Sequence, residues 1–294
     1  MKNMQVLNFG SLNIDHVYQV PHFVRPKETL GCSGYRRFAG GKGLNQSIAL
    51  ARAGLRTAHA GKIGPDGEFL ADILRDAGVD VSFLRRGSVA TGHACIQVDS
   101  SGQNSILLYP GANFALTEEE IRETLDAVSA GTVLLLQNEI NLIQFLMDCA
   151  CQRGLRIAIN PAPCAPEVSA YPLNYAEWLF VNEVEAAQLA GREGEPEELA
   201  EILASRFPNP EIIMTLGGEG ALFRHGNQMF RQPPVPAEVV DTTSAGDTFT
   251  GYFIAARLRG MSPEQSMLAA SRAAALAVSR AGAAVSIPTA EEVF

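Results

Sequence analysis

An acidic residue inside the first turn of a predicted helix is the feature of this chain with the clearest chemical meaning. Segment Asp241–Gly251 has the pattern of a strand end, a turn of small residues and a helix start that holds Asp247. The free N–H groups and the dipole of a helix start favour negative charge. Asp247 could therefore accept a proton from a hydroxyl that attacks a phosphate. On this segment alone, Asp247 could equally well only complement the helix dipole.

A second glycine-rich turn, Gly40–Asn45, precedes another predicted helix. Its glycines let the backbone approach a ligand closely, and Lys42 adds a cation. The turn is not a Walker A loop, because Gly43 follows the lysine, and it is not a dinucleotide fingerprint, because Gln46 replaces the third glycine. Like the similar turn Thr215–Gly220, it is by itself compatible with ordinary turn chemistry.

These turns must be positioned by the elements around them, and short β-rich runs alternate with helical patterns along most of the chain. The alternation predicts an α/β fold with a mostly parallel, Rossmann-like central sheet flanked by helices. Capping-box patterns begin two of the helices. The predicted strands are Val6–Phe9, Val133–Gln137, Leu155–Ile159, Trp178–Val181 and Ile212–Leu216, and the predicted helices are Thr117–Val128, Pro196–Phe207 and Ser262–Arg280.

Two regions break this alternation with strand patterns that have no helix between them. The strands Asp15–Val20, Leu30–Phe38, Thr91–Val98 and Ser105–Tyr109, with a hairpin turn at Asp99–Asn104, predict a small antiparallel sheet. We expect it to form a lid from segments of about 15–38 and 91–109 within a single domain spanning 1–294. The alternative is that these strands are edges of the central sheet.

Composition limits the class of partner and compartment. The 294 residues carry a net charge of −9, which argues against a nucleic acid or an anionic membrane as the main partner. Neither a leader pattern nor a long apolar segment is visible, so we predict a soluble, cytoplasmic protein. The odd, scattered set Cys32, Cys95, Cys149, Cys151 and Cys164 has no metal-ligand spacing and suits a reducing compartment.

The order and separation of five motifs resemble the PfkB-type carbohydrate kinases over nearly the whole chain. The motifs are Gly10–Asp15, Gly40–Asn45, Asn182–Glu185, Thr215–Gly220 and Asp241–Gly251. Asn160–Pro163 and Leu108–Asn113 also resemble the ribose-phosphorylating members of that family. The resemblance implies a Rossmann-like domain with a β-sheet lid that transfers the ATP γ-phosphate to a sugar hydroxyl.

The resemblance also implies a role for individual residues at the reacting centre. Asp247 matches the catalytic base, and Ser244, Ala245 and Gly246 match the turn that holds the transferring phosphoryl group. The positions that match sugar-binding residues are Asn13, Asp15, Gly41, Lys42, Gly43, Asn45 and Glu139, together with Asp247.

Other matching positions belong to the nucleotide and its ions. The ATP-binding set is Asn182, Thr215, Leu216, Gly217, Gly218, Glu219, Gly220, Gly246 and Ser271, and Glu185 matches a residue that contacts Mg²⁺ through water. A monovalent cation, K⁺, is implied as an activator at Asp241, Thr243, Ala277, Arg280, Gly282 and Ser286, mostly through backbone carbonyls.

Two departures from the family pattern leave the sugar open. Lys27 stands where these kinases usually have glycine, and Asn138 replaces an apolar residue before Glu139. We predict that D-ribose is converted to D-ribose 5-phosphate, with 2-deoxyribose, another pentose, a ketohexose or a nucleoside as alternative acceptors. A non-catalytic sugar-binding regulatory module is the alternative from another class.

The apolar residues of the predicted lid suggest that the chain binds a second copy of itself. A two-stranded edge cannot cover them alone, so we expect a homodimer that forms through the lids. The candidate residues are Val17, Val20, Phe38, Ile96 and Leu107.

Overall fold

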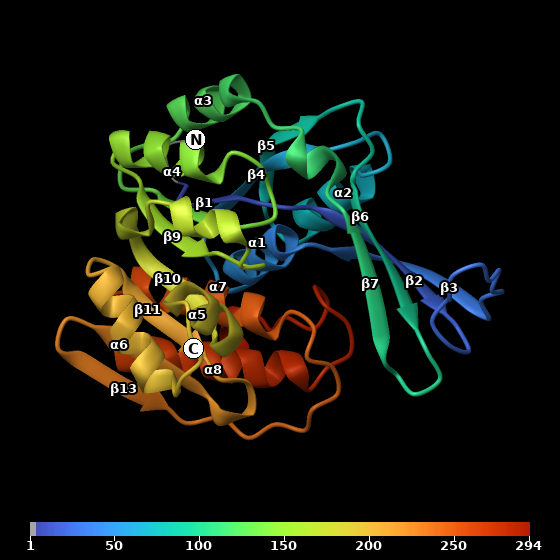
Figure 1. Cartoon of the computed structure of the whole chain (residues 1–294). Helices are drawn as coiled ribbons and strands as arrows, with labels where there is room; N and C mark the ends of the chain where they lie inside the picture. Colours follow the sequence, from blue (N-terminus) through green and yellow to red (C-terminus); the bar gives the residue numbers. More distant parts are fainter. Residues whose placement is uncertain (1–3) are drawn as a thin grey trace.

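A large sheet of mostly parallel strands forms the centre of the protein (Figure 1). The computed structural model describes residues 4–294, and within them nine strands join this sheet. All neighbours from β11 to β5 pair in parallel, whereas β12 and β13 add an antiparallel edge. In spatial order the strands are β13 (Gln228–Gln232), β12 (Ala221–His225), β11 (Glu211–Thr215), β10 (Ala176–Asn182), β9 (Arg156–Asn160), β8 (Val133–Gln137), β1 (Val6–Phe9), β4 (Thr57–Ile63) and β5 (Asp80–Arg86).

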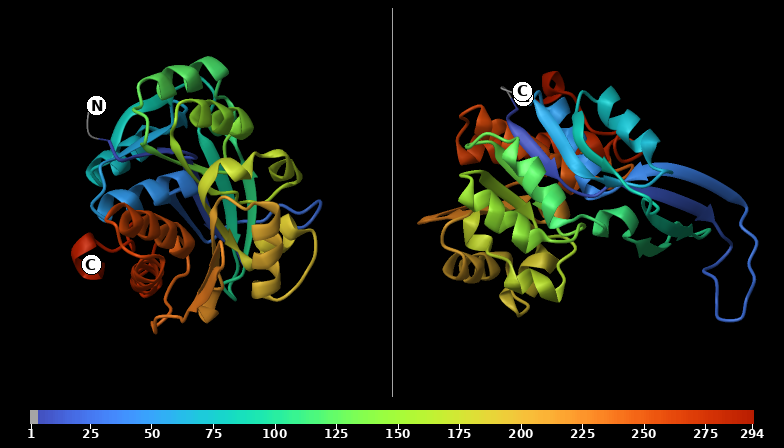
Figure 2. Two further views of the ribbon diagram at one scale, coloured as in Figure 1. Left: turned by 90° about the vertical axis from the view of Figure 1, so that its left-hand side faces the viewer. Right: turned by 90° about the horizontal axis from the view of Figure 1, so that it is seen from above.

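Helices cover both faces of this sheet, which is why its central strands are buried (Figure 2). One apolar core lies under α1 (Lys42–Arg52), α2 (Glu68–Asp76), α7 (Ala245–Leu258), α8 (Pro263–Val278) and α9 (Ala290–Val293). The other core lies under α3 (Glu118–Asp126), α4 (Ile143–Gln152), α5 (Glu183–Ala190) and α6 (Pro196–Arg206). Short 3₁₀ turns occur at η1 (Gly111–Phe114), η2 (Pro166–Ala170), η3 (Leu173–Tyr175) and η4 (Gly217–Glu219).

A second, smaller sheet projects from the side of the central one (Figure 1). Within residues 4–294 it has four strands, in the order β3 (Gly34–Gly40), β2 (Asn13–Gln19), β6 (Gly92–Val98) and β7 (Asn104–Tyr109). The β2–β3 and β6–β7 pairs are antiparallel as predicted, but β2 pairs with β6 in parallel, so the prediction of a purely antiparallel sheet is wrong for the central pair. The alternative that these strands are edges of the central sheet is therefore wrong.

The predicted α/β architecture with a small second sheet is confirmed, and most predicted bounds differ from the observed ones by a few residues. The predicted β1 and β8 agree with the structure at both ends. The capping boxes at Thr117 and Ser262 are present, although α8 ends at Val278, before the predicted Arg280. Four strands are not predicted from the sequence, namely β4, β5, β12 and β13, because β4 carries alanine and glycine and the others lack a continuous apolar run.

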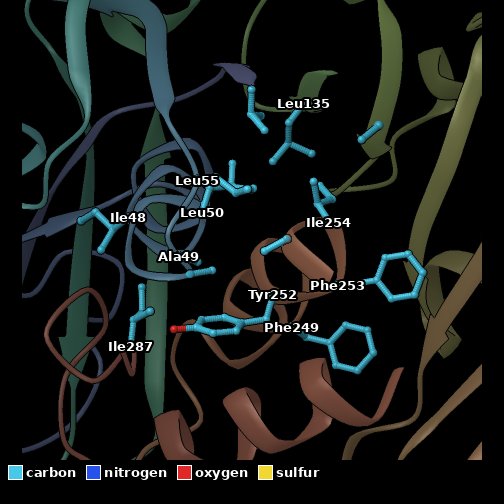
Figure 3. Close-up of a cluster of buried hydrophobic side chains, with 14 of the residues drawn as sticks. Ile48, Ala49, Leu50, Leu55, Leu135, Phe249, Tyr252, Phe253, Ile254 and Ile287 are labelled. Carbon is cyan, nitrogen blue, oxygen red and sulfur yellow. The ribbon is translucent and has the colours of Figure 1, made fainter. Parts of the chain in front are cut away.

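The helices α1 and α7 pack against each other over the central sheet (Figure 3). Their backbones approach closely at Gly251, where an added Cβ would lie 2.5 Å from the Ala49 Cβ. Only a glycine permits this distance, so the contact fixes how the start of α1 stands relative to the start of α7. The two glycine-rich turns predicted to be functional are thereby brought together.

Candidate active site

Asp247 lies in the first turn of α7, beside a cavity. Ser244 precedes the helix in the left-handed region, with φ 63°, and its hydroxyl donates to the Ala283 carbonyl rather than capping the helix. The first N–H groups of a helix have no intrahelical partners. Gly246 is exposed, and an added Cβ would meet nothing within 4 Å. The turn can therefore present N–H donors to an anion.

Two side chains from α1 hold the buried carboxylate of Asp247. Asn45 Nδ2 donates to Oδ2 at 3.1 Å, and Gln46 Nε2 donates to Oδ1 at 2.9 Å. Burial raises the pKa of Asp247, while the Lys42 charge and the two amide donors act in the opposite direction. The Asn45 Oδ1 atom is buried and has no protein partner among the described residues. It is an acceptor available to a ligand hydroxyl.

The start of α1 depends on glycine. Gly41 is its N-cap residue with φ 94°, and an added Cβ at Gly43 would lie 2.4 Å from the Ser11 backbone nitrogen. The α1 start thus lies directly on the segment that follows β1. Burial lowers the pKa of Lys42, but the carboxylates of Asp247, Glu139 and Glu185 outweigh it and keep the ammonium charged.

Acidic and amide side chains gather where the small sheet joins the large one. Glu139 Oε2 accepts from the Lys42 N–H at 3.0 Å and also from the Ser11 hydroxyl. Burial, with the Glu139 charge adding to it, raises the pKa of Asp15 to about 6. Asn13 Oδ1 accepts from Asn113 Nδ2 at 2.8 Å. Such a set of acceptors and amides suits the hydroxyls of a sugar.

Next to Asp247 lie two adjoining pockets at the carboxyl ends of the parallel strands, the usual ligand position in such sheets. A polar pocket of about 480 Å³ is lined by Lys42, Asn182, Thr215, Gly217, Thr242, Asp247 and the α7 start. An apolar pocket of about 550 Å³ shares Thr215, Gly217 and Gly246 with it and continues along Gly218, Gly220, Pro234, Val239, Phe249 and Ser271. The pair suits a phosphate chain followed by a flat apolar ring.

The structure does not bring every sequence-predicted nucleotide residue to these pockets. Leu216 is buried in the core under α5 and α6, and Glu219 is exposed and lies 3.8 Å from Arg231. Asn182 and Glu185 form the capping box of α5, so both side chains have a structural role there. Burial raises the pKa of Glu185, which interacts with the charges of Lys42 and Asp247.

The residues predicted for a monovalent cation lie in two adjacent loops. Asp241 links them: its N–H donates to the Val278 carbonyl, and its carboxylate accepts from the N–H groups of Thr243 and Gly282. Arg280 pairs with Glu292 at 2.5 Å, so only its carbonyl could face an ion. The Ser286 hydroxyl donates to the Ala283 carbonyl. The carbonyl of Ala277, another residue predicted for this site, already accepts a hydrogen bond from the Arg280 N–H.

Both departures from the family pattern have a local explanation. Lys27 adopts φ 69°, the left-handed region that favours glycine, so the turn keeps its shape despite the side chain. Asn138 faces away from Glu139: its Nδ2 donates to the Pro163 carbonyl at 2.8 Å, and its Oδ1 accepts from the Tyr171 hydroxyl at 2.6 Å. Asn138 therefore braces the loop after β9.

One residue predicted for the apolar lid face is on the wrong side. Leu107 pairs with Cys95, which pairs with His16, whereas Val17 pairs with Ile96, which in turn pairs with Ile106. Because side chains alternate along a strand, Leu107 lies on the opposite face from Val17. The neighbours Ile106 and Leu108 occupy the expected face. Val20 is buried.

Sequence reasoning missed three polar residues that position this site: Ser11, Gln46 and Asn113. Ser11 contacts Glu139, Gln46 contacts Asp247, and Asn113 contacts Asn13. Ser11 and Asn113 stood inside recognised motifs, and Gln46 follows one directly. The signal that could have found them is their polarity within segments predicted to be buried.

Comparison with known proteins places the chain in a family. Residues 3–290 match the pfkB family carbohydrate kinases, and the chain belongs to this family. It is 36% identical to the ribokinase of Haemophilus influenzae, with 99% of this chain and 97% of that protein covered. Among solved structures, it resembles ribokinase of Arabidopsis thaliana complexed with ribose and ATP, with TM-score 0.87, 30% identity and 99% and 97% coverage. It also resembles ribokinase of Cryptococcus neoformans in complex with ADP, with TM-score 0.86, 33% identity and 99% and 98% coverage.

Among residues 4–294, no helix has the length and apolar character needed to cross a bilayer.

Proposed function

We propose that the protein transfers the γ-phosphoryl group of ATP to D-ribose and forms D-ribose 5-phosphate. The observation that carries the proposal is the position of Asp247 between two subsites. Asn45 and Gln46 hold its carboxylate on the acceptor side, while its own helix start lines the polar pocket. Similar ribokinases bind ribose and ATP in one structure and ADP in another, which supports the same classes of ligand for this protein.

In the proposed reaction Asp247 accepts the proton of the sugar hydroxyl. The hydroxyl oxygen then bonds to the γ-phosphorus as the bond to the bridging β–γ oxygen breaks and ADP leaves. The N–H groups of Ser244, Ala245 and Gly246 and the Lys42 ammonium would stabilise the negative charge on the transferring group. Burial raises the pKa of Asp247, which makes the carboxylate a stronger base.

The acceptor groups support a sugar with several neighbouring hydroxyls. Asn13, Asp15 and Glu139 offer acceptors, and Asn45 offers a buried oxygen without a protein partner among the described residues. A sugar that lacks one hydroxyl would leave one of these groups unpaired, at a cost of about 1–3 kcal/mol. We therefore expect ribose to be preferred over 2-deoxyribose.

Two ions are part of the proposal. Mg²⁺ would accompany the ATP phosphates, with Glu185 acting through water, because described residues 4–294 offer no cluster of three side-chain metal ligands. K⁺ would lie between the loops that Asp241 links, where backbone carbonyls and the Ser286 oxygen provide the donors. Chelation of Mg²⁺ should abolish turnover, and replacement of K⁺ by a bulky organic cation should reduce it.

We further propose a homodimer that forms through the small sheet, which would act as a lid, in a cytoplasmic and reducing setting. The face that carries Val17, Phe38, Ile96, Ile106 and Leu108 includes three side chains that are about half exposed. Ile106→Lys combined with Leu108→Lys should give a monomer mass by light scattering. Leu107→Lys, on the opposite face, is the matched control. A monomer in the unaltered protein at every concentration contradicts the dimer.

The function is tested by a panel of sugars with ATP and Mg²⁺, measured for the unaltered protein and for Asp247→Asn. We expect the highest kcat/KM with D-ribose and a fall in kcat of about 10²- to 10⁴-fold in the variant, because a general base contributes this much. Ribose binding by calorimetry should persist in the variant. A higher kcat/KM for deoxyribose, a ketohexose or a nucleoside would reject ribose, and sugar binding without ATP turnover would favour the regulatory module.

A further inference from the structure

Three buried amide side chains form a chain of hydrogen bonds that ends on Asp247. Asn8 belongs to β1, Gln137 to the last position of β8, and Gln46 to α1, and each has 0% exposure. Buried amides are costly unless they are hydrogen-bonded, because folding removes them from water. Their presence behind the reacting centre therefore requires an explanation.

Every amide hydrogen of the three side chains has an acceptor. Asn8 Nδ2 donates to the Gly43 carbonyl at 2.7 Å and to Ser47 Oγ at 2.8 Å. Gln137 Nε2 donates to Asn8 Oδ1 at 2.9 Å and to Gln46 Oε1 at 2.7 Å. Gln46 Nε2 donates to Asp247 Oδ1 at 2.9 Å and, at 3.4 Å, to Asn160 Oδ1.

The orientation of all three amides is fixed, because the groups at the two ends of the chain can only accept hydrogen bonds. These groups are the Gly43 carbonyl and the ionised Asp247 carboxylate. The Gly43 carbonyl orients Asn8, Asn8 Oδ1 orients Gln137, and Gln137 orients Gln46 with its NH₂ group toward Asp247. Turning over any one amide would set two oxygens against each other or two NH₂ groups against each other. The donor that Asp247 meets is thus determined by a backbone carbonyl at the other end.

This arrangement is not the most stable filling of the space. Gln137 Oε1 is buried without a partner among the described residues, and such an acceptor costs about 1–3 kcal/mol. Gly10 must also remain glycine, since an added Cβ would lie 2.1 Å from that oxygen. A stability role alone would be served better by apolar side chains.

We infer that Gln46 is a positioning residue for phosphoryl transfer, and that Asn8 and Gln137 keep its NH₂ group directed at Asp247. The inference rests on the proposed role of Asp247 as the base. Gln46 holds one carboxylate oxygen, so the rotamer of Asp247 is fixed and the other side of the group stays turned toward the acceptor. The NH₂ group of Gln46 also favours the ionised form of the Asp247 carboxylate, which can take up a proton.

A branch of the same network provides a control. Ser47 Oγ accepts from Asn8 and lies 2.8 Å from His59 Nδ1, to which its hydroxyl hydrogen can donate. Burial lowers the pKa of His59 to about 3, so the ring stays neutral. This branch leads away from Asp247, and Asn8 keeps its bond to the Gly43 carbonyl without it.

The test is the pH dependence of kcat/KM for ribose at saturating ATP in Gln46→Met, Gln137→Met and Ser47→Ala. Methionine keeps the length of glutamine but cannot donate. The charged groups that act on Asp247, namely Lys42 of α1, Glu139 after β8 and Glu185 of α5, remain in all variants. Unfolding by urea is measured in parallel, so that loss of fold is recognised.

In Gln46→Met we expect kcat to fall about 10- to 100-fold, as for a lost hydrogen bond to a charged group. The acid limb of the pH profile of kcat/KM should move up by about one pH unit, because the carboxylate loses a donor. The KM for ribose should change less than about threefold. Gln137→Met should shift the limb in the same direction by less, and Ser47→Ala should leave it in place.

An acid limb that stays in place in both methionine variants would overturn the inference, even if their stability falls. If Gln46→Met does not fold, Gln137→Met decides alone, because it retains the Gln46 donor and removes only its orientation. Should Asp247→Asn keep the turnover of the unaltered protein, the proposed base fails instead, whatever the amide variants do.

Discussion

The candidate site around Asp247 and the small sheet differ in how much of their structure is fixed by packing. Around Asp247, side chains from α1 and α7 are buried, and Asn45 and Gln46 both donate to its carboxylate. On the small sheet, Phe38, Ile106 and Leu108 stand about half exposed. A substitution near Asp247 should therefore disturb packed neighbours, whereas one at an exposed position of the small sheet should mainly change a surface in contact with solvent.

The largest expected difference between the two regions comes from the same substitution made in each. Gly251→Val would drive a branched side chain into Ala49, where even one Cβ atom approaches to 2.5 Å. We expect the free energy of unfolding to fall by about 3 kcal/mol and the remaining folded protein to be nearly inactive, because α1 and α7 separate. Gly31→Val, at an exposed site where an added Cβ would meet nothing within 4 Å, should change neither the free energy of unfolding nor the activity. Equal losses in urea unfolding for the two variants would contradict the comparison.

The next effect concerns Asp15, at the border between the regions. Its pKa is about 6 in the folded protein and 3.8 as the ordinary value. The folded state therefore keeps a proton that the unfolded chain releases, and the free energy of unfolding falls as pH rises through this window.

Asp15→Asn removes that loss. The ligand-free variant should gain about 1–3 kcal/mol at pH 8 relative to the unaltered protein, and less at pH 4, while its KM for ribose rises. Urea unfolding at both pH values measures this, with exposed Asp76→Asn as the control. A variant that is less stable at pH 8 would show that Asp15 is held by a favourable partner.

A smaller effect is expected on the loop that Asn138 braces. Tyr171→Phe removes the hydroxyl that donates to Asn138 Oδ1 at 2.6 Å, so stability should fall by about 1 kcal/mol. KM for ribose should rise only slightly, because the loop lies beside Glu139 without containing a proposed sugar contact. Tyr175→Phe, at an exposed ring, is the control. A loss of kcat without a loss of stability would place Tyr171 in the chemistry.

The smallest effect belongs to the tip of the small sheet. Lys27→Gly relieves a left-handed conformation at φ 69°, but glycine also gains freedom in the unfolded chain. A net gain of about 0.5 kcal/mol is expected in thermal or urea unfolding, with activity unchanged. Lys27→Ala keeps the Cβ atom and should give no gain. Loss of activity in Lys27→Gly would mean that the lysine side chain itself is used.

The sequence predicted the fold because strand runs, capping boxes and glycine turns are local signals. β1 and β8 were predicted at both ends, and Thr117 caps its helix as expected. Leu107 was placed on the wrong face because the sequence does not show the pairing register, and a register one residue off puts every side chain of a strand on the other face. Gln46 and Asn113 were missed because their partners lie 201 and 100 residues away, beyond any local pattern.

The large sequence separation between Asp247 and its partners also matters while the chain is being synthesised. The bonds from α1 to Asp247 span about two-thirds of the sequence, with a sequence separation of 202 between Asn45 and its partner. Domains generally acquire such non-local contacts late, and synthesis proceeds from the N-terminus. A growing chain can thus display the α1 turn long before α7 emerges, yet it lacks Asp247, the residue proposed as the base. With Asp247 as the base, phosphoryl transfer would begin only when α7 has docked against α1, so an unfinished chain would not consume ATP by this reaction.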